Sequence, residues 1–136
     1  MTPRRTASRA LVALGSIGLI VAAAAHYPAY QKISAPAVHA SNLPGAMQSV
    51  FEIAFLSMGW SWFVLALIAL VAAFGEARLG KPVVLICGFA VLIQTAFIVS
   101  LSGLFGGDEL IGAASLLIII GGLFASETRA GQVPGN

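Results

Sequence analysis

The sequence predicts an all-α fold, a four-helix transmembrane bundle with antiparallel helices, and three observations lead to this prediction. Of the 136 residues, 59% are hydrophobic and 9% are charged, whereas a soluble domain typically has about 25% charged residues. Four long stretches carry no charge, and they are continuously apolar rather than alternating, as expected of helices that cross a bilayer core of about 30 Å. They cover residues 10–31, 53–75, 82–107 and 110–126. We therefore predict one transmembrane domain over residues 1–136, with spans at about 10–30, 53–74, 83–105 and 110–126 and an outer loop at 31–43.

The first span also has features of a secretory signal peptide. Arg4, Arg5 and Arg9 precede an apolar run that reaches the small-residue sequence 23–25, and a second A-x-A-like site ends at Ala40. The apolar run continues through Tyr27, whereas a signal core has about 7–15 residues. An uncleaved anchor helix is the favoured interpretation, and cleavage stays open as the alternative.

The basic residues predict the orientation. Lys and Arg near span ends concentrate on the cytoplasmic side. With both termini in the cytoplasm of a bacterial inner membrane, the cytoplasmic face carries six of the seven basic residues and the outer face carries only Lys32. The six are Arg4, Arg5, Arg9, Arg78, Lys81 and Arg129.

Residues at the span ends predict where helices begin and end. Asn42 followed by Pro44 is a suitable N-cap and first-turn pair for the second long helix, and Gly75 suits its C-terminal end. Asp108 and Glu109 open the fourth span, where carboxylates favour the positive end of the helix dipole.

Small residues recur at steps of three, four or seven along each span, which places them on one face of a helix. Helices in lipid associate through close packing at such residues, so the stripes predict a compact bundle. The alternative is that Gly and Ala are simply common in membrane helices. The stripes are Gly15, Gly18, Ala22 and Ala25; Gly59, Ala66, Ala69 and Ala73; Gly88, Thr95 and Ser102; and Gly112, Ser115, Ile119, Gly122 and Ser126.

The distribution of ionisable residues excludes several functional classes. No Asp, Glu, Lys, Arg or His lies near the middle of a predicted span, and such groups usually mark ion and proton pathways. A small proton-coupled multidrug transporter is therefore disfavoured. Two histidines and scattered carboxylates do not suit a metal site, and the single cysteine, Cys87, suits a small buried hydrophobe. We expect no catalytic residue, no cofactor, no metal and no nucleic-acid partner; the expected partners are the lipid bilayer and a second copy or another membrane protein.

Four residues are candidates for a ligand site or an interface. His26 and Glu52 are expected at similar depth near the outer rim if the first two spans are neighbours, and a carboxylate there would orient a charged imidazole. Trp60 lies deeper on the second span. The alternative is an ordinary interfacial belt of aromatic residues and histidine. Gln94, near the centre of the third span, either contacts a polar ligand or forms an interhelical hydrogen bond, and the second interpretation is favoured.

The first two spans resemble those of small four-helix bacterial membrane proteins of no established activity. The resemblance rests on His26, Pro44 and the run Gly59-Trp60-Ser61-Trp62, and it implies the fold but no residue role. The leading functional hypothesis is a non-enzymatic accessory or interaction component of the membrane. The alternative is a binder of lipid or a hydrophobic small molecule, with or without enzymatic activity, at the rim of His26, Glu52 and Trp60. A transporter or channel subunit is the least favoured.

Overall fold

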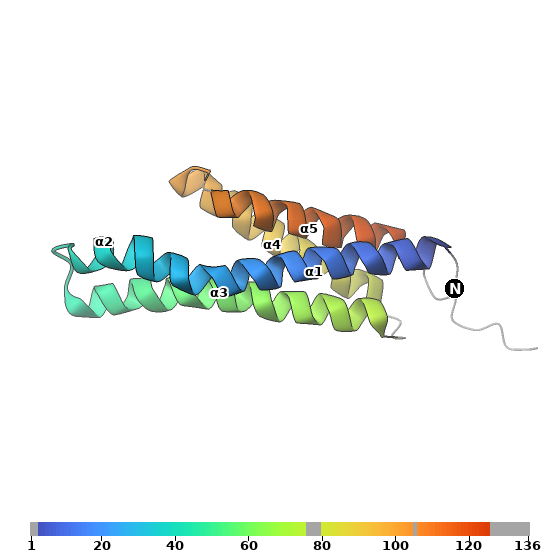
Figure 1. The fold of residues 1–136 in the computed structure, drawn as a ribbon, viewed down its shortest axis with the longest axis horizontal. Helices are drawn as coiled ribbons and strands as arrows, with labels where there is room; N and C mark the ends of the chain where they lie inside the picture. The colour runs from blue at the N-terminus through green and yellow to red at the C-terminus, as the bar shows by residue number, and fades with distance from the viewer. Residues whose placement is uncertain (1–2, 76–79, 105, 126–136) are drawn as a thin grey trace, which may run out of the picture.

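The computed structural model describes residues 3–75, 80–104 and 106–125, and its secondary structure is entirely helical in these ranges. Four helices are long and apolar enough to cross a membrane, which confirms the predicted all-α class with four helices of membrane-spanning length. The elements in chain order are α1 (Pro3–Ala29), the π-helical turn η1 (Tyr30–Ser34), α2 (Ala35–His39), α3 (Gly45–Phe74), α4 (Gly80–Ser102) and α5 (Gly106–Phe124) (Figure 1).

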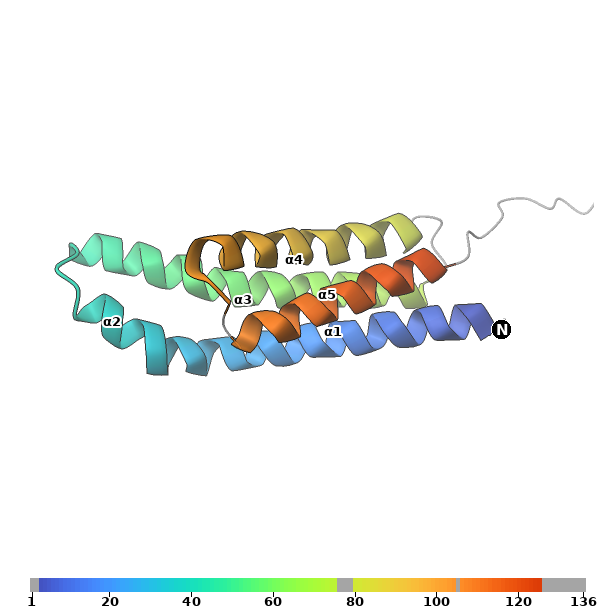
Figure 2. The same cartoon turned by 90° about the horizontal axis from the view of Figure 1, so that it is seen from above.

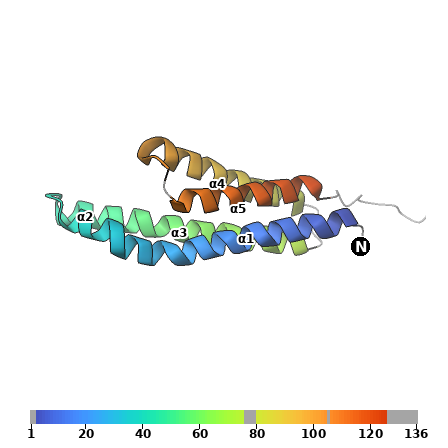
Figure 3. The ribbon, with the colours of Figure 1, turned by 45° about the horizontal axis from the view of Figure 1, so that its top comes forward.

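The four long helices form a closed ring of neighbours. Helix α1 packs against α5 and α3, and α4 packs against the same two helices (Figure 2). The unit of α1, η1 and α2 and its neighbour α3 continue past the ends of α4 and α5 on one side, which we call the α2 end (Figures 1 and 3). The opposite side, where the chain begins, is called the N-terminal end. The α2 end therefore consists of two helices alone, whereas the rest of the molecule has four.

The expected outer loop at 31–43 is shorter in the structure, because helix continues through η1 and α2 to His39. Pro36 explains the irregular turn before α2. It lies in the first turn of α2, and a proline ring collides with the carbonyl group four residues earlier in an α-helix, which here belongs to Lys32 of η1. Widening to a π-helical turn relieves this collision without breaking the helix. The true connection to α3 is only residues 40–44.

The start of α3 differs from the predicted cap, whereas two other predicted boundaries are confirmed. Pro44 is itself the N-cap residue, and its carbonyl oxygen accepts hydrogen bonds from the backbone N–H groups of Met47 and Gln48. Asn42 lies two residues too early to cap the helix. Gly75 is the C-cap of α3, and its N–H donates to the Val71 carbonyl. Asp108 and Glu109 lie in the first turn of α5.

Close approach between helices occurs where small residues were predicted to lie. A Cβ atom at Gly15 would lie 2.5 Å from the Ala114 carbonyl oxygen of α5, and one at Gly122 would lie 2.9 Å from Cδ2 of Leu85. Gly121, which is outside the predicted stripe, also makes a close contact, since its Cβ would lie 2.7 Å from Cγ2 of Val12. Gly88 of α4 meets Ile119 of α5 in the same way. Gly112 is an exception, since nothing lies within 4 Å of its Cβ position. Ser126 lies outside the described residues.

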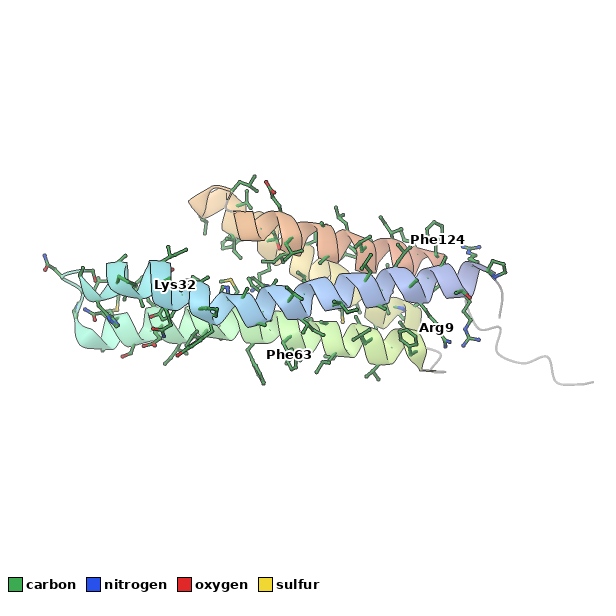
Figure 4. All side chains as sticks on the ribbon, in the orientation of Figure 1. Arg9, Lys32, Phe63 and Phe124 are labelled. Atoms are coloured by element: carbon green, nitrogen blue, oxygen red, sulfur yellow. The ribbon has the colours of Figure 1, made fainter. Side chains whose placement is uncertain are left out.

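Two polar side chains of α1 fasten the N-terminal end. The buried Ser8 hydroxyl donates a 2.7 Å hydrogen bond to the Gly121 carbonyl oxygen of α5. The Arg9 guanidinium donates to the carbonyl oxygens of Ala73 and Phe74 and lies 5.3 Å from the centroid of the Phe74 ring. A cation at the C-terminus of α3 is favourable because the last carbonyl groups there have no helical partner. Figure 4 shows Arg9 at this end. Arg78 and Arg129 lie outside the described residues.

Replacing Gly15 by alanine is expected to destabilise the bundle, because the new methyl group collides with the backbone of α5 rather than with a flexible side chain. Overpacking of this kind costs about 1–3 kcal/mol. Gly112→Ala is the matched control, since its Cβ would meet open space and alanine is the better helix former by about 0.5–1 kcal/mol. Unfolding of both variants in mixed detergent micelles measures the difference. Equal stability of the two variants would contradict the close α1–α5 contact.

Candidate functional site

A groove opens between α1 and α3 on the side turned away from α4 and α5. Its volume is about 420 Å³. Both helices contribute residues at spacings of three and four, so the groove follows the line where the two helices meet. Figure 4 shows Phe63, one of these residues, on the side of α3 turned away from α5. The lining residues are Ile20, Ala23, Ala24, His26 and Tyr27 of α1 and Leu56, Gly59, Trp60 and Phe63 of α3. Small side chains at three of these positions make the hollow, and aromatic rings form its walls.

His26 is held in one orientation by α3. Its Nε2 atom donates a 2.9 Å hydrogen bond to the carbonyl oxygen of Phe55. The imidazole stacks on the Phe55 ring at 4.2 Å between centroids and meets the edge of Trp62 at 4.8 Å. Because a carbonyl oxygen only accepts hydrogen bonds, Nε2 carries the proton of the neutral ring and Nδ1 is its acceptor atom.

Gly59 makes room for this ring. A Cβ atom at Gly59 would lie 2.9 Å from Cδ2 of His26. Any larger residue would push the imidazole away from α3 and off the Phe55 carbonyl. The sequence singled out Gly59 as a member of a small-residue stripe and of the Gly59–Trp62 run, whereas the structure shows that it is the contact surface of the histidine.

Trp60 forms the exposed wall of the groove. Its side chain is 67% exposed, and its ring stacks on Phe63 at 5.4 Å between centroids. Trp62, two residues later, is only 3% exposed and faces the bundle interior. The two tryptophans of the Gly59–Trp62 run therefore have different environments, one exposed on the surface of the bundle and one packed between helices.

Within the described residues no ion pair joins Glu52 to His26, and Nε2 of the imidazole donates instead to the Phe55 carbonyl oxygen of α3. Glu52 lies one helical turn before Leu56, toward the α2 end, and is half-buried. The structure thus brings His26 and Trp60 together in one groove and places Glu52 just beyond it.

Gln94 does not line the groove. Its Oε1 atom accepts a 3.1 Å hydrogen bond from Nε1 of Trp62, which joins α4 to α3. This geometry agrees with the favoured interpretation of Gln94 as a residue that holds two helices together. Thr95 beside it donates to the Val91 carbonyl of its own helix.

Residues 3–75, 80–104 and 106–125 contain no group of three or more His, Cys, Asp or Glu side chains placed to hold a metal ion. Phe55 and Phe63 were not predicted as site residues, because large apolar residues are frequent on every span. The pattern of Ala23, Ala24 and Gly59 on two adjacent helices was the available signal for a hollow at this depth.

Comparison with known proteins does not add residue roles. No protein-family model matches the chain, and no curated protein and no solved structure shows significant similarity to it. The functional argument therefore rests on the geometry of the groove.

Removing the imidazole of His26 is expected to destabilise the α1–α3 contact, because the change removes a hydrogen bond and two aromatic contacts. We expect His26→Ala to lower the free energy of unfolding by about 1–3 kcal/mol. His39→Ala is the control, since His39 is exposed and surface changes usually stay within about 0.5 kcal/mol. Thermal unfolding in detergent, followed by tryptophan fluorescence, measures both. A His26 variant as stable as the His39 variant would show that the imidazole does not join the helices.

The Trp62–Gln94 hydrogen bond is best measured by a double-mutant cycle. Trp62→Phe and Gln94→Leu each remove one partner, and the double variant removes both. We expect a coupling free energy of about 0.6–1.7 kcal/mol, the range found for polar contacts between membrane helices. Thr95→Val in place of Gln94→Leu gives the control cycle, because Thr95 bonds only within α4. Equal coupling in the two cycles would contradict the interhelical bond.

Proposed function

We propose that this protein is a membrane-embedded binder of a lipid or lipid-like molecule, and that the α1–α3 groove holds the apolar chain of this molecule. The groove itself is the observation that carries the proposal. It is about 420 Å³ in volume, and only His26, Tyr27 and Trp60 among its lining side chains contain a polar atom. Binding sites for small molecules are commonly apolar hollows with a few fixed polar groups of this kind.

The proposal includes an orientation in a bacterial inner membrane, with antiparallel helices and both termini cytoplasmic. The basic residues support it. Arg4, Arg5 and Arg9 belong to the N-terminal end, and Lys32 lies at the α2 end (Figure 4). Because basic residues concentrate on the cytoplasmic side, the α2 end faces outward. The groove, which is closer to the α2 end, then opens to the outer leaflet.

His26 supports binding rather than acid–base chemistry. Its Nε2 proton is engaged by the Phe55 carbonyl, and its other nitrogen is the acceptor that a ligand hydroxyl or amine would use. The fixed ring thus provides one oriented acceptor beside an apolar channel.

A second candidate function is that of an accessory component that docks on another membrane protein, and the α2 end supports it. Ile33, Val50 and Ile53 are exposed there, on the part of the molecule that α4 and α5 do not cover (Figure 2). A partner would co-purify after mild extraction, and its loss in an Ile53→Lys variant would favour this function over lipid binding.

Filling the groove tests the lipid-binding proposal. Ala24→Phe places a ring in the hollow, and we expect a several-fold loss of co-purified lipid when native mass spectrometry of the gently extracted protein is compared with the wild type. Ala96→Phe is a matched control, because Ala96 is an exposed alanine of α4 that does not line the groove. The two positions have similar depth, each within two residues of a side chain that contacts Trp62.

Retention of lipid that is equal in the Ala24 and Ala96 variants would overturn the groove as the binding site. Thermal unfolding of each variant shows whether a loss of lipid reflects a filled groove or a damaged bundle.

A further inference from the structure

Two polar side chains lie where the groove ends toward the outer rim. On α3, Glu52 precedes the lining residue Leu56 by four positions, so it lies on the same helix face one turn further out. Tyr30, the first residue of η1, follows the lining residue Tyr27 of α1 by three positions. The register of the two helices therefore brings Tyr30 and Glu52 to the same end of the same groove.

The hydroxyl group of Tyr30 is unusual because, among the residues that the structure describes, it is buried without a hydrogen-bond partner. The Tyr30 side chain is 1% exposed, and its ring packs 5.1 Å from that of Phe55. Within the described part of the chain, its hydroxyl has no hydrogen-bond partner. A buried polar group without a hydrogen-bond partner lowers the stability of a protein by about 1–3 kcal/mol. Most buried polar groups in native proteins therefore have a partner. Tyr30 also begins the π-helical turn, and such turns occur frequently at functional sites.

Glu52 adds a charge to this position. Phe55, whose ring packs against that of Tyr30, is one turn along α3 from Glu52, so Glu52 and Tyr30 lie at the same level of the α1–α3 contact. The carboxylate is half-buried. In residues 3–75, 80–104 and 106–125 no Lys, Arg or His forms an ion pair with it. A carboxylate only accepts hydrogen bonds, and it binds a charged donor more strongly than a neutral one.

We propose that Tyr30 and Glu52 form a head-group subsite that binds the primary ammonium group of a membrane lipid whose chain lies in the groove. The subsite rests on the proposed function, since it selects among the molecules that the groove holds. The ammonium donates to the Glu52 carboxylate, and the Tyr30 hydroxyl gains a partner in the same head group. The apolar channel recognises the chain, and the two side chains at its outer end recognise the charge.

Tryptophan quenching by brominated lipid tests the subsite. The protein is placed in phosphatidylcholine vesicles that contain a small fraction of a phospholipid with brominated chains, and the exposed Trp60 reports chains in the groove. Ethanolamine and choline head groups are compared on the same chains, because both are zwitterionic but only ethanolamine has N–H donors. We expect about ten-fold preferential quenching by the ethanolamine lipid, as one charge-assisted hydrogen bond provides. Trp60→Phe, which removes the reporter, should abolish the quenching signal from the groove.

Two conservative variants assign the preference to its residues. Glu52→Gln and Tyr30→Phe keep the shape of each side chain and are expected to remove the ethanolamine preference while quenching by the chain remains. Lys32→Gln is the charge control at the same end of the molecule and is expected to keep the preference. A brominated lipid with a glycerol head group supplies neutral hydroxyl donors. We expect it to quench Trp60 no more strongly than the choline lipid does, apart from an effect of its own charge. The Lys32→Gln variant measures that charge effect.

The outcomes separate the two proposals. Quenching without any head-group preference, or a preference that survives both Glu52→Gln and Tyr30→Phe, would overturn the subsite and leave the groove as a binding site. Equal preference for glycerol and ethanolamine head groups would overturn the assignment to an ammonium group. The bulk fraction of brominated lipid predicts a certain amount of quenching in the absence of a binding site. If the wild type and the Ala24→Phe variant both show no more quenching than this amount, the proposed function is overturned and the subsite with it.

Discussion

Close contact of α1 with its neighbours, at residues without side chains, is the constraint on which the bundle depends. In lipid the hydrophobic effect provides little drive for helices to associate, so packing and hydrogen bonds must do it. Gly15 and Gly121 bring the backbones of α1 and α5 together, and Ser8 joins them with a hydrogen bond. This contact fixes the rotation of α1 about its axis. Val12 and Leu19 then face the core, and Ala24, about a third of a turn away, faces the groove.

Polar contacts between helices occur at three levels of the bundle. Ser8 and Arg9 act at the N-terminal end, the pair of Trp62 and Gln94 joins α3 to α4 near the middle, and His26 joins α1 to α3 nearer α2. Five other hydroxyl groups bond to carbonyl groups of their own helix: Ser57, Ser61, Thr95, Ser100 and Ser115. Hydrogen bonds between side chains and neighbouring helices are therefore few, and apolar packing fills the space between their levels.

The helices and their packing faces were accessible from the sequence, but the irregular α2 end and the groove were not. Charge-free length predicts a span because the cost of a charge in lipid is local to the residue that carries it. Pro36 was taken as a loop residue, since the sequence does not show that a π-helical turn accommodates it. His26 was expected to meet Glu52, but imidazole also bonds to backbone carbonyl groups, which carry no sequence signal. An interhelical contact of Gln94 was predictable, because an amide within a span has few hydrogen-bond partners other than groups on a neighbouring helix. The identity of its partner, Trp62, was not predictable.

The unequal lengths of the four helices have a consequence for the membrane around them. At 1.5 Å per residue, the 19 residues of α5 extend about 28 Å and the 30 residues of α3 about 45 Å. A bilayer that fits the α5 side is thinner than the one that would cover α3. In a bilayer, the lipid around the perimeter must therefore stretch or compress, or the long pair of the α1–η1–α2 unit and α3 must tilt. Each response costs a fraction of a kcal/mol per ångström of mismatch between helix length and bilayer thickness. For helices of such unequal length, the annulus of lipid in a bilayer would be asymmetric, and bilayer thickness would become a variable that sets their tilt.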